Sequence, residues 1–192
     1  MKLVLATGSR HKLREFGMLV APHVLEPLAG GVDLGPEIGL TFAENALGKA
    51  VVAAGAMGVA AIGDDSGIEA EALGGAPGIY SRRYAGETAT DEENLAKLIR
   101  EVPAGSRLAY VCALAFVDPT SAQQVVFEGR CTGRMSDGPR GGGGFGYDPV
   151  FLPDDGPGDL TMAELSDSEK HAISHRGRAV RELLAWLESA GG

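Results

Sequence analysis

Two adjacent carboxylates, Asp64 and Asp65, follow a short apolar segment in the stretch AIGDDSGIEA, residues 61–70. Successive residues of an extended strand point to opposite faces, so these side chains are not expected to form a side-by-side acid–base pair. One carboxylate can then face a ligand while the other braces the turn. Carboxylate oxygens suit Mg²⁺, and a carboxylate can also deprotonate an attacking water. The alternative is an Asp-rich turn without chemistry, because Asp, Ser and Gly are common turn residues.

A second polar cluster, TGSRHK at residues 7–12, combines hydroxyls, a glycine and cations directly before a predicted helix. Backbone N–H groups and the dipole at a helix N-terminus favour phosphate. An ordinary strand-to-helix turn is the competing interpretation. Glu37, in the loop GPEIG, could add a carboxylate to a metal site, although by itself it would be a solvated charge.

Two further clusters lie later in the chain. In GGGGFGYDP, residues 141–149, exposed Phe145 and Tyr147 could stack on a nucleobase, with glycines permitting close approach. The alternative is that Phe145 anchors an irregular loop in the core. In SEKHAISHRGRA, Lys170, His175 and Arg176 place donors for an oxo group or phosphate near the start of the last helix. A solvated helix face is the alternative for these three residues.

The first half of the chain must position these clusters through alternating strands and helices. The apolar pattern predicts three strands, at residues 2–7, 24–28 and 59–63. A helix that carries Leu13 and Phe16 follows the first strand, and a loop at 29–39 follows the second. Between that loop and the third strand, Thr41 and Glu44 predict a capping box at the start of a second helix. The resulting β-α-β-α-β order is typical of an α/β sheet.

The second half contains a capped helix and a hairpin. Thr90 and Glu93 predict the start of the helix. Apolar runs at 108–117 and 124–135, separated by DPTSA, predict the hairpin, and a last helix carries apolar residues at 180, 183, 184 and 187. Without internal repeats or a long linker, we expect one domain over residues 1–192.

Composition narrows the function classes. The chain has 192 residues, 44% of them apolar, and a net charge of −9, which disfavours nucleic acid and acidic membrane surfaces as partners. An anionic ligand would therefore need local cations or a metal. The apolar segments near the N-terminus and at 50–62 are too short for a signal peptide or a membrane span, so we expect a cytoplasmic protein. Cys112 and Cys131 are expected to be buried thiols, with a cross-strand disulfide as the alternative.

The polar clusters belong to longer blocks that resemble, in order and spacing, those of the inosine/xanthosine triphosphate pyrophosphatases: LATGSRHKLREF, TFAENALGKA, DDSGIEAEALGGAPGIYSRRYAG, GGFGYDPVF and AELSDSEKHAISHRGRA. The resemblance implies Mg²⁺-dependent hydrolysis of ITP, dITP and XTP to the monophosphate and pyrophosphate. It also implies a homodimer, and an α/β fold with a central mixed sheet, flanking helices and two lobes around a deep nucleotide-binding cleft.

The same resemblance implies roles for individual residues. Asp65 would be the general base and a metal ligand, and Glu37 the second metal ligand. The triphosphate would be held by Thr7, Gly8, Ser9, Arg10, His11, Lys12, Lys49 and Ser66. The base and sugar would be covered by Phe145, Gly146, Tyr147 and Asp148, with Phe145 stacking. Lys170, His175 and Arg176 would contact the purine, and the last two would favour a 6-oxo over a 6-amino group.

The chain departs from the family pattern at two positions. Ser9 stands where Asn is usual, which shortens a hydrogen-bonding side chain, and Gly63 stands where Ala is common, which is expected to loosen the turn.

Two rival functions remain open. A Maf-like pyrophosphatase would have a Ser-rich, Pro-Arg-Arg opening in place of TGSRHK. A nucleotide-binding sensor without hydrolysis is disfavoured by the intact Asp65, Glu37 and Lys12.

Overall fold

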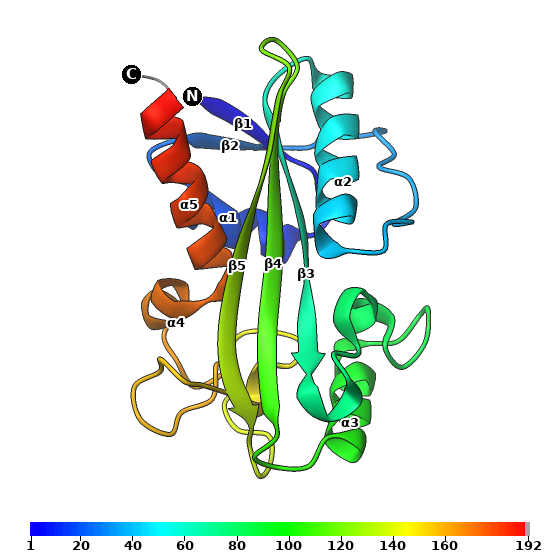
Figure 1. Cartoon of the computed structure of the whole chain (residues 1–192), viewed down its shortest axis with the longest axis vertical. Helices are drawn as coiled ribbons and strands as arrows, with labels where there is room; N and C mark the ends of the chain where they lie inside the picture. The colour runs from blue at the N-terminus through cyan, green and yellow to red at the C-terminus, as the bar shows by residue number, and fades with distance from the viewer. Residues whose placement is uncertain (191–192) are drawn as a thin grey trace. The chain divides into compact units, whose positions relative to one another are not determined.

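A computed structural model describes residues 1–190 and contains a six-stranded mixed sheet of order β2-β1-β3-β4-β5-β6 (Figure 1). The chain divides into two compact units. Of the described residues, unit 1 contains 1–65, 112–129 and 176–190, and unit 2 contains 66–111 and 130–175. Strands β3, β4 and β5 contribute residues to both units.

Unit 1 begins with the predicted strand-helix-strand segment. Strand β1 (Lys2–Leu5) pairs in parallel with β2 (Val24–Pro27) and with β3 (Ala61–Ala70), and Val4 is opposite Ala61 in the second pair. Helix α1 (Arg10–Leu19) connects β1 to β2. Helix α2 (Phe42–Met57) precedes β3 and ends at Gly58, whose φ of 65° suits a glycine C-cap.

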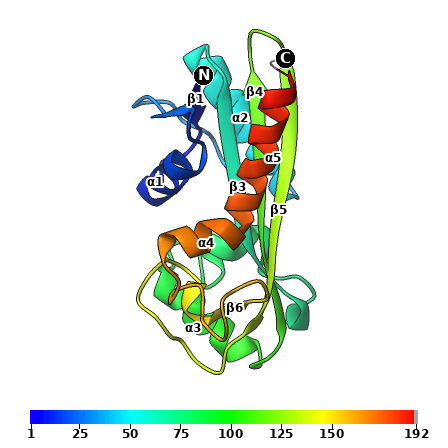
Figure 2. The ribbon, with the colours of Figure 1, turned by 90° about the vertical axis from the view of Figure 1, so that its left-hand side faces the viewer.

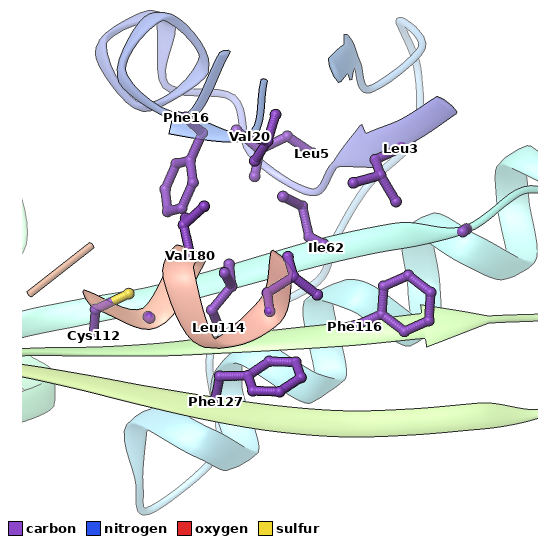
Figure 3. Packing of buried hydrophobic residues seen from close by; sticks show 13 residues of the cluster. Leu3, Leu5, Phe16, Val20, Ile62, Cys112, Leu114, Phe116, Phe127 and Val180 are labelled. Carbon is purple, nitrogen blue, oxygen red and sulfur yellow. The ribbon is translucent and has the colours of Figure 1, made fainter. Parts of the chain in front are cut away.

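The two faces of the sheet in unit 1 carry side chains of different size. Leu3, Leu5 and Ile62 pack with Phe16 of α1 and Val180 of α5 (His175–Ala190), as Figure 3 shows. The opposite face packs small residues against the alanines of α2, in a cluster that includes Val4, Ala6, Ala46, Ala50, Ala61 and Ala113. Figure 2 shows α5 in front of β4 and α2 behind it. Small side chains on both sides let α2 lie close to the strands.

Gly63 is the closest point of that contact. A Cβ atom at this position would lie 2.2 Å from the backbone oxygen of Ala46 and 2.8 Å from the nitrogen of Ala50. Because Gly63 lies within β3, no turn is present for it to loosen. The prediction of a looser turn at Gly63 was therefore wrong, and the glycine instead permits close helix–strand packing.

Unit 2 contains the remaining residues of β3, β4 and β5. Helix α3 (Asp91–Glu101) starts with the predicted capping box between Thr90 and Glu93. Strands β4 (Arg107–Asp118) and β5 (Gln123–Met135) are the two runs of the predicted hairpin, and β6 (Phe151–Pro153) pairs antiparallel with β5. The core of this unit contains Ile68, Leu98, Tyr110, Cys131, Met135, Tyr147, Phe151 and Met162.

Most predicted elements are confirmed, with a few differences. The last predicted helix is preceded by a separate short helix, α4 (Asp167–Ile173), so Lys170 lies on α4 whereas His175 begins α5. The capping box at α2 is half formed, because the Thr41 side chain accepts from Glu44 N while the Glu44 carboxylate accepts from Leu40 N. Strand β6 was not predicted.

Three other expectations concern the whole chain. Cys112 and Cys131 are buried thiols that form no disulfide, as expected. None of the helices within residues 1–190 is both long and apolar enough to cross a membrane. The single domain over residues 1–192 stays a prediction.

Candidate active site

Two carboxylates in unit 1 meet at one cation. The Lys49 ammonium donates to Glu37 Oε1 at 2.9 Å and to Asp65 Oδ1 at 3.0 Å. Asn45 Nδ2 donates to the other oxygen, Asp65 Oδ2, at 3.1 Å. Asn45 and Lys49 are four residues apart on α2, a spacing that places both on one side of the helix. We call Glu37, Asn45, Lys49 and Asp65 the carboxylate cluster.

Helix α2 also holds the loop that carries Glu37. The side-chain oxygen of Asn45 accepts from Gly39 N at 2.8 Å, while its amide nitrogen reaches Asp65. The Glu44 carboxylate accepts from Leu40 N at 2.6 Å. The first turn of α2 therefore fixes both the loop and the catalytic candidate in β3.

The surroundings of Asp65 make its carboxylate more basic than usual. Burial raises the pKa of Asp65, and this effect outweighs the opposing attraction of Lys49. Burial alone would lower the pKa of Lys49, but Asp65 and Glu37 reverse this and raise it, so the lysine stays charged. The charged lysine offsets the repulsion between the two carboxylates, while the raised pKa leaves Asp65 suited to accept a proton.

The donor set fits a divalent cation that substrate phosphates would help to bind. Within residues 1–190, no group of three or more His, Cys, Asp or Glu side chains forms a metal-binding cluster. Glu37 and Asp65 nevertheless point at one positive charge, with the Lys49 ammonium standing where a cation would be attracted. Mg²⁺ is commonly held by one or two carboxylates plus substrate phosphates, so these residues fit it.

The other carboxylate, Asp64, faces the opposite side of β3. It forms an ion pair with Lys12 of α1, and Arg176 Nε of α5 lies 3.9 Å from Asp64 Oδ1. Arg176 Nη1 also donates to Glu15 Oε2 at 2.8 Å, and the Cys112 thiol donates to Asp64 Oδ1 at 3.2 Å. We call Lys12, Glu15, Asp64, Cys112 and Arg176 the Asp64 network.

Two cations hold Asp64 in its ionised form. Burial would raise the pKa of this carboxyl, but Lys12 and Arg176 outweigh it and hold the pKa well below its usual range. Burial and the neighbouring Asp64 together raise the pKa of the Cys112 thiol well above its usual value, so it remains a donor. Asp64 and Asp65 therefore lie on opposite faces of β3. This confirms the prediction that the two carboxylates do not form a side-by-side pair.

The predicted phosphate segment surrounds the start of α1. Ser9 is the N-cap, and its hydroxyl accepts from Lys12 N at 3.4 Å while its own N–H donates to Thr7 Oγ1 at 3.1 Å. Gly8, Arg10 and His11 are exposed, and His11 contacts the guanidinium of Arg14. Ser9 therefore performs a capping role for which Asn is also suited.

The predicted base-binding residues of unit 2 gather around Asp148. Its Oδ2 accepts from Lys170 Nζ at 2.6 Å and from Phe145 N at 2.9 Å. Its Oδ1 accepts from the hydroxyl of Tyr110 at 3.0 Å, and the Tyr110 ring stacks on His175. We call Tyr110, Phe145, Asp148, Lys170 and His175 the aromatic cluster.

One aromatic of the glycine-rich loop differs from its prediction. Tyr147 is only 6% exposed, and its hydroxyl donates to Ser81 O at 2.6 Å. The prediction of an exposed Tyr147 was wrong, because a buried hydroxyl with a backbone acceptor is stable in the core. Phe145 is half-buried, with the Lys170 ammonium 5.0 Å from its ring centre, and Gly146 is also half-buried.

The structure places the predicted residues in separate groups. Glu37, Lys49 and Asp65 meet in unit 1, as do Lys12 and Arg176. In unit 2, Phe145, Asp148 and Lys170 meet, while Ser66 is half-buried in β3, directly after Asp65.

Sequence reasoning assigned no site role to several residues that complete these groups: Glu15, Asn45, Tyr110 and Cys112. Spacing carried a signal for two of them. Glu15 follows Lys12 by three residues and Asn45 precedes Lys49 by four, so each shares a helix side with a predicted site residue.

Comparisons with known proteins identify the family of the chain. Residues 3–186 match the model of the Ham1 family. The chain is 47% identical over 201 aligned positions to a protein of Photorhabdus laumondii named dITP/XTP pyrophosphatase, covering 98% of this chain and 99% of that protein. A Shigella flexneri protein of the same name is 48% identical and covers 98% of each chain.

Solved structures show the same fold. The Ham1 protein of Staphylococcus aureus has a TM-score of 0.84 at 38% identity, covering 99% of this chain and 100% of that one. A HAM1 protein from Coxiella burnetii has a TM-score of 0.86 at 36% identity, covering 98% and 99%. The chain therefore belongs to the Ham1 family, which confirms the family and the α/β fold predicted from its sequence blocks.

Proposed function

We propose that this protein hydrolyses the non-standard purine nucleoside triphosphates ITP, dITP and XTP to the monophosphate and pyrophosphate. The observation that carries the proposal is that Glu37 and Asp65 both accept a hydrogen bond from the Lys49 ammonium, and that the Asp65 carboxylate has a raised pKa. The two relatives described above support the substrate class, because both are named dITP/XTP pyrophosphatase.

Asp65 is the general base in this proposal. Its carboxylate takes a proton from water as the water oxygen bonds to the α-phosphorus, and the bond from the α-phosphorus to its β-bridging oxygen breaks. Pyrophosphate leaves with the electrons of that bond. Asn45 holds Asp65 Oδ2, which leaves Oδ1, now paired with Lys49, as the oxygen that changes partner.

Glu37 and Asp65 would hold Mg²⁺, which when bound supplies positive charge for the phosphates. Lys49 lies between the same carboxylates and would donate to a phosphate oxygen of the substrate. The remaining triphosphate contacts are assigned to Thr7, Gly8, Ser9, Arg10, His11, Lys12 and Ser66. Local cations are necessary because the chain has a net charge of −9.

The purine is assigned to a set of donors and one half-buried aromatic ring. Phe145 would stack on the base, while Lys170, His175 and Arg176 would donate to its 6-oxo group. Gly146 and Asp148 would shape the sugar side of the loop, and Tyr147 would anchor that loop from the core. Adenine presents an amino group to these donors, which leaves them unpaired, so ATP is expected to be a poor substrate.

We also propose that the chain acts in the cytoplasm as a homodimer and as one domain. The exposed hairpin between β4 and β5 and helix α5 are the surfaces we assign to the dimer. Sedimentation velocity at several concentrations tests the assembly, and a species of one chain's mass throughout contradicts it.

Pyrophosphate release from ITP, XTP, dITP, GTP, ATP and dTTP, each with Mg²⁺ and with EDTA, tests the function. We expect release from ITP, XTP and dITP only with metal. Preference for dTTP would replace the proposal with a Maf-like activity. Absence of release from every nucleotide, with retained ITP binding, would indicate a sensor.

A further inference from the structure

Tyr110 connects two residues of the proposed purine site without being one of the residues assigned to touch the nucleotide. It lies in β4 and is 8% exposed. Its ring stacks on the His175 imidazole, with centroids 4.8 Å apart and planes 12° apart. Its hydroxyl donates to Asp148 Oδ1 at 3.0 Å. One side chain thus contacts both a candidate purine donor and the carboxylate that anchors the Phe145 loop.

Asp148 depends on this hydroxyl because it is itself buried. The carboxylate is 3% exposed, and its Oδ2 already accepts from the Lys170 ammonium and from Phe145 N. The backbone is fitted to it as well, since a Cβ at Gly144 would lie 2.1 Å from Asp148 Oδ2. Loss of the Tyr110 hydroxyl would remove a donor from Oδ1 and allow the carboxylate to turn. That rotation would move Lys170 and the Phe145 loop together.

The ring of Tyr110 has a separate task. Stacking on this ring restricts rotation of the His175 imidazole, and the Tyr110 ring is in turn packed against Phe151, with their centroids 4.6 Å apart. A fixed imidazole plane matters for recognition, because a hydrogen bond to a purine oxygen weakens steeply when its angle is poor. The hydroxyl therefore acts through Asp148, whereas the ring acts through His175.

We infer that Tyr110 is a positioning residue that sets purine selectivity by holding Asp148 through its hydroxyl and His175 through its ring. This inference rests on the proposed function for its kinetic consequence, but the contacts themselves exist without substrate. It predicts that two substitutions at one position have different effects. Removal of the hydroxyl changes the loop anchor, and removal of the ring also releases the imidazole.

Kinetics of Tyr110→Phe and Tyr110→Leu with ITP and ATP test the two tasks. Tyr110→Phe is expected to raise KM for ITP by about fivefold to tenfold with kcat little changed, because one hydrogen bond to a buried carboxylate is lost. Tyr110→Leu is expected to lower the ratio of kcat/KM for ITP over ATP by about tenfold. Tyr84→Phe is the matched control, since its hydroxyl lies in the same unit but contacts Glu101, which is not a member of the aromatic cluster.

A second measurement separates this inference from the proposed function. The ring protons of His175 are followed by NMR in the absence of nucleotide, with the signal assigned through His175→Gln. Tyr110→Phe should preserve their ring-current shift, whereas Tyr110→Leu should remove it. If the wild-type protein hydrolyses none of the nucleotides, the proposed function fails. The NMR result alone then decides whether the Tyr110 ring stacks on the His175 imidazole.

Three results would overturn the inference. One is an unchanged His175 signal in Tyr110→Leu. Another is a Tyr110→Phe enzyme whose KM for ITP equals that of the wild type and of Tyr84→Phe. The third is a loss of kcat/KM of the same size for ITP and ATP in Tyr110→Leu, because selectivity would then not depend on this ring.

Discussion

Asp64 and Asp65 are adjacent in one strand, yet their surroundings shift their pKa values in opposite directions. Asp64 is buried beside two cations, Lys12 and Arg176, which outweigh burial and lower its pKa. Asp65 is buried beside Lys49, which it shares with Glu37, so burial prevails and raises its pKa. The balance of cations and carboxylates on each face of β3 decides whether the pKa is raised or lowered.

This difference shows how one strand can carry a structural carboxylate and a reactive one. Asp64 is 2% exposed and holds together α1, β3 and α5 within unit 1. Asp65 is held by hydrogen bonds from a single helix, α2, so a substitution of Asp65 affects fewer elements than one of Asp64. A carboxylate with a raised pKa is the better base, whereas one with a lowered pKa is the better permanent anion.

The largest effect is expected for Asp65→Asn. The amide cannot accept the proton of the attacking water, so kcat for ITP should fall by about 10²- to 10⁴-fold. Stability should change little or increase, because a buried charge with incomplete compensation is removed. Steady-state pyrophosphate release and urea unfolding measure the two quantities, and near-normal turnover would refute the role of Asp65 as base.

Asp64→Asn should have the opposite profile, with its main effect on stability. The amide takes the Asp64 carboxylate from half-buried Lys12 and from buried Arg176, and we expect the free energy of unfolding to fall by about 3–5 kcal/mol. Urea unfolding beside Asp65→Asn provides the matched comparison. Equal stability of the two variants would break the proposed distinction between the faces.

Gly63→Ala tests the α2 face alone. The added methyl would meet the backbone of α2 at Ala46, so stability should fall by about 1–3 kcal/mol as the helix moves away from Asp65. The control is Gly48→Ala on the exposed side of α2, where nothing lies within 4 Å of the new atom. That variant should gain about 0.5–1 kcal/mol, because alanine favours a helix interior over glycine. Equal thermal unfolding of both variants would contradict the close contact.

Local sequence signals were sufficient for most of the elements and for the separation of the two carboxylates. Caps at Thr41 and Thr90, and the alternation of strand side chains, act over a few residues and are visible in the sequence. The family resemblance, by contrast, assigned Glu37 and Asp65 to the metal and Lys49 to the triphosphate. The three side chains meet in unit 1, while their roles stay predictions.

The sequence alone did not show which residues would contact each charged side chain. Arg176 and Glu15 are 161 positions apart, and only the packing of α1 and α5 brings them together. One of the two aspartates was expected to brace a turn, but the strand continues through both to Ala70. The burial of Tyr147 depends on Ser81 O, an acceptor that no local pattern indicates. Such contacts depend on packing rather than on spacing.

A smaller effect is expected in the pH dependence of stability, measured with EDTA. The pKa of Asp64 is lowered in the folded protein, so its stabilisation is present above pH ~4 and is lost as the pH falls below that value. The pKa of Asp65 is raised, so its contribution is present below pH ~4 and is lost as the pH rises through the folded-state pKa.

The wild type should therefore gain stability over Asp64→Asn as the pH rises in the acid range, and lose stability relative to Asp65→Asn over the range above it. A tenfold difference in proton affinity between the folded and unfolded protein corresponds to about 1.4 kcal/mol. Urea unfolding between pH 3 and 7 measures both differences. Differences of the same sign in both variants would show that the two faces do not differ in this way.

The smallest effect is expected at Cys112, which contacts only the Asp64 side of the pair. Cys112→Ala removes a donor to Asp64 Oδ1, and we expect a loss of about 1 kcal/mol in unfolding free energy. Cys112→Ser keeps a hydroxyl donor at the same place and should recover part of that loss. Because the two cations still hold Asp64, and the carboxylate cluster lies on the other face, kcat should be unchanged in both variants. A fall in kcat at wild-type stability would mean that the two faces of β3 are coupled in catalysis, and that strand alternation alone does not separate their functions.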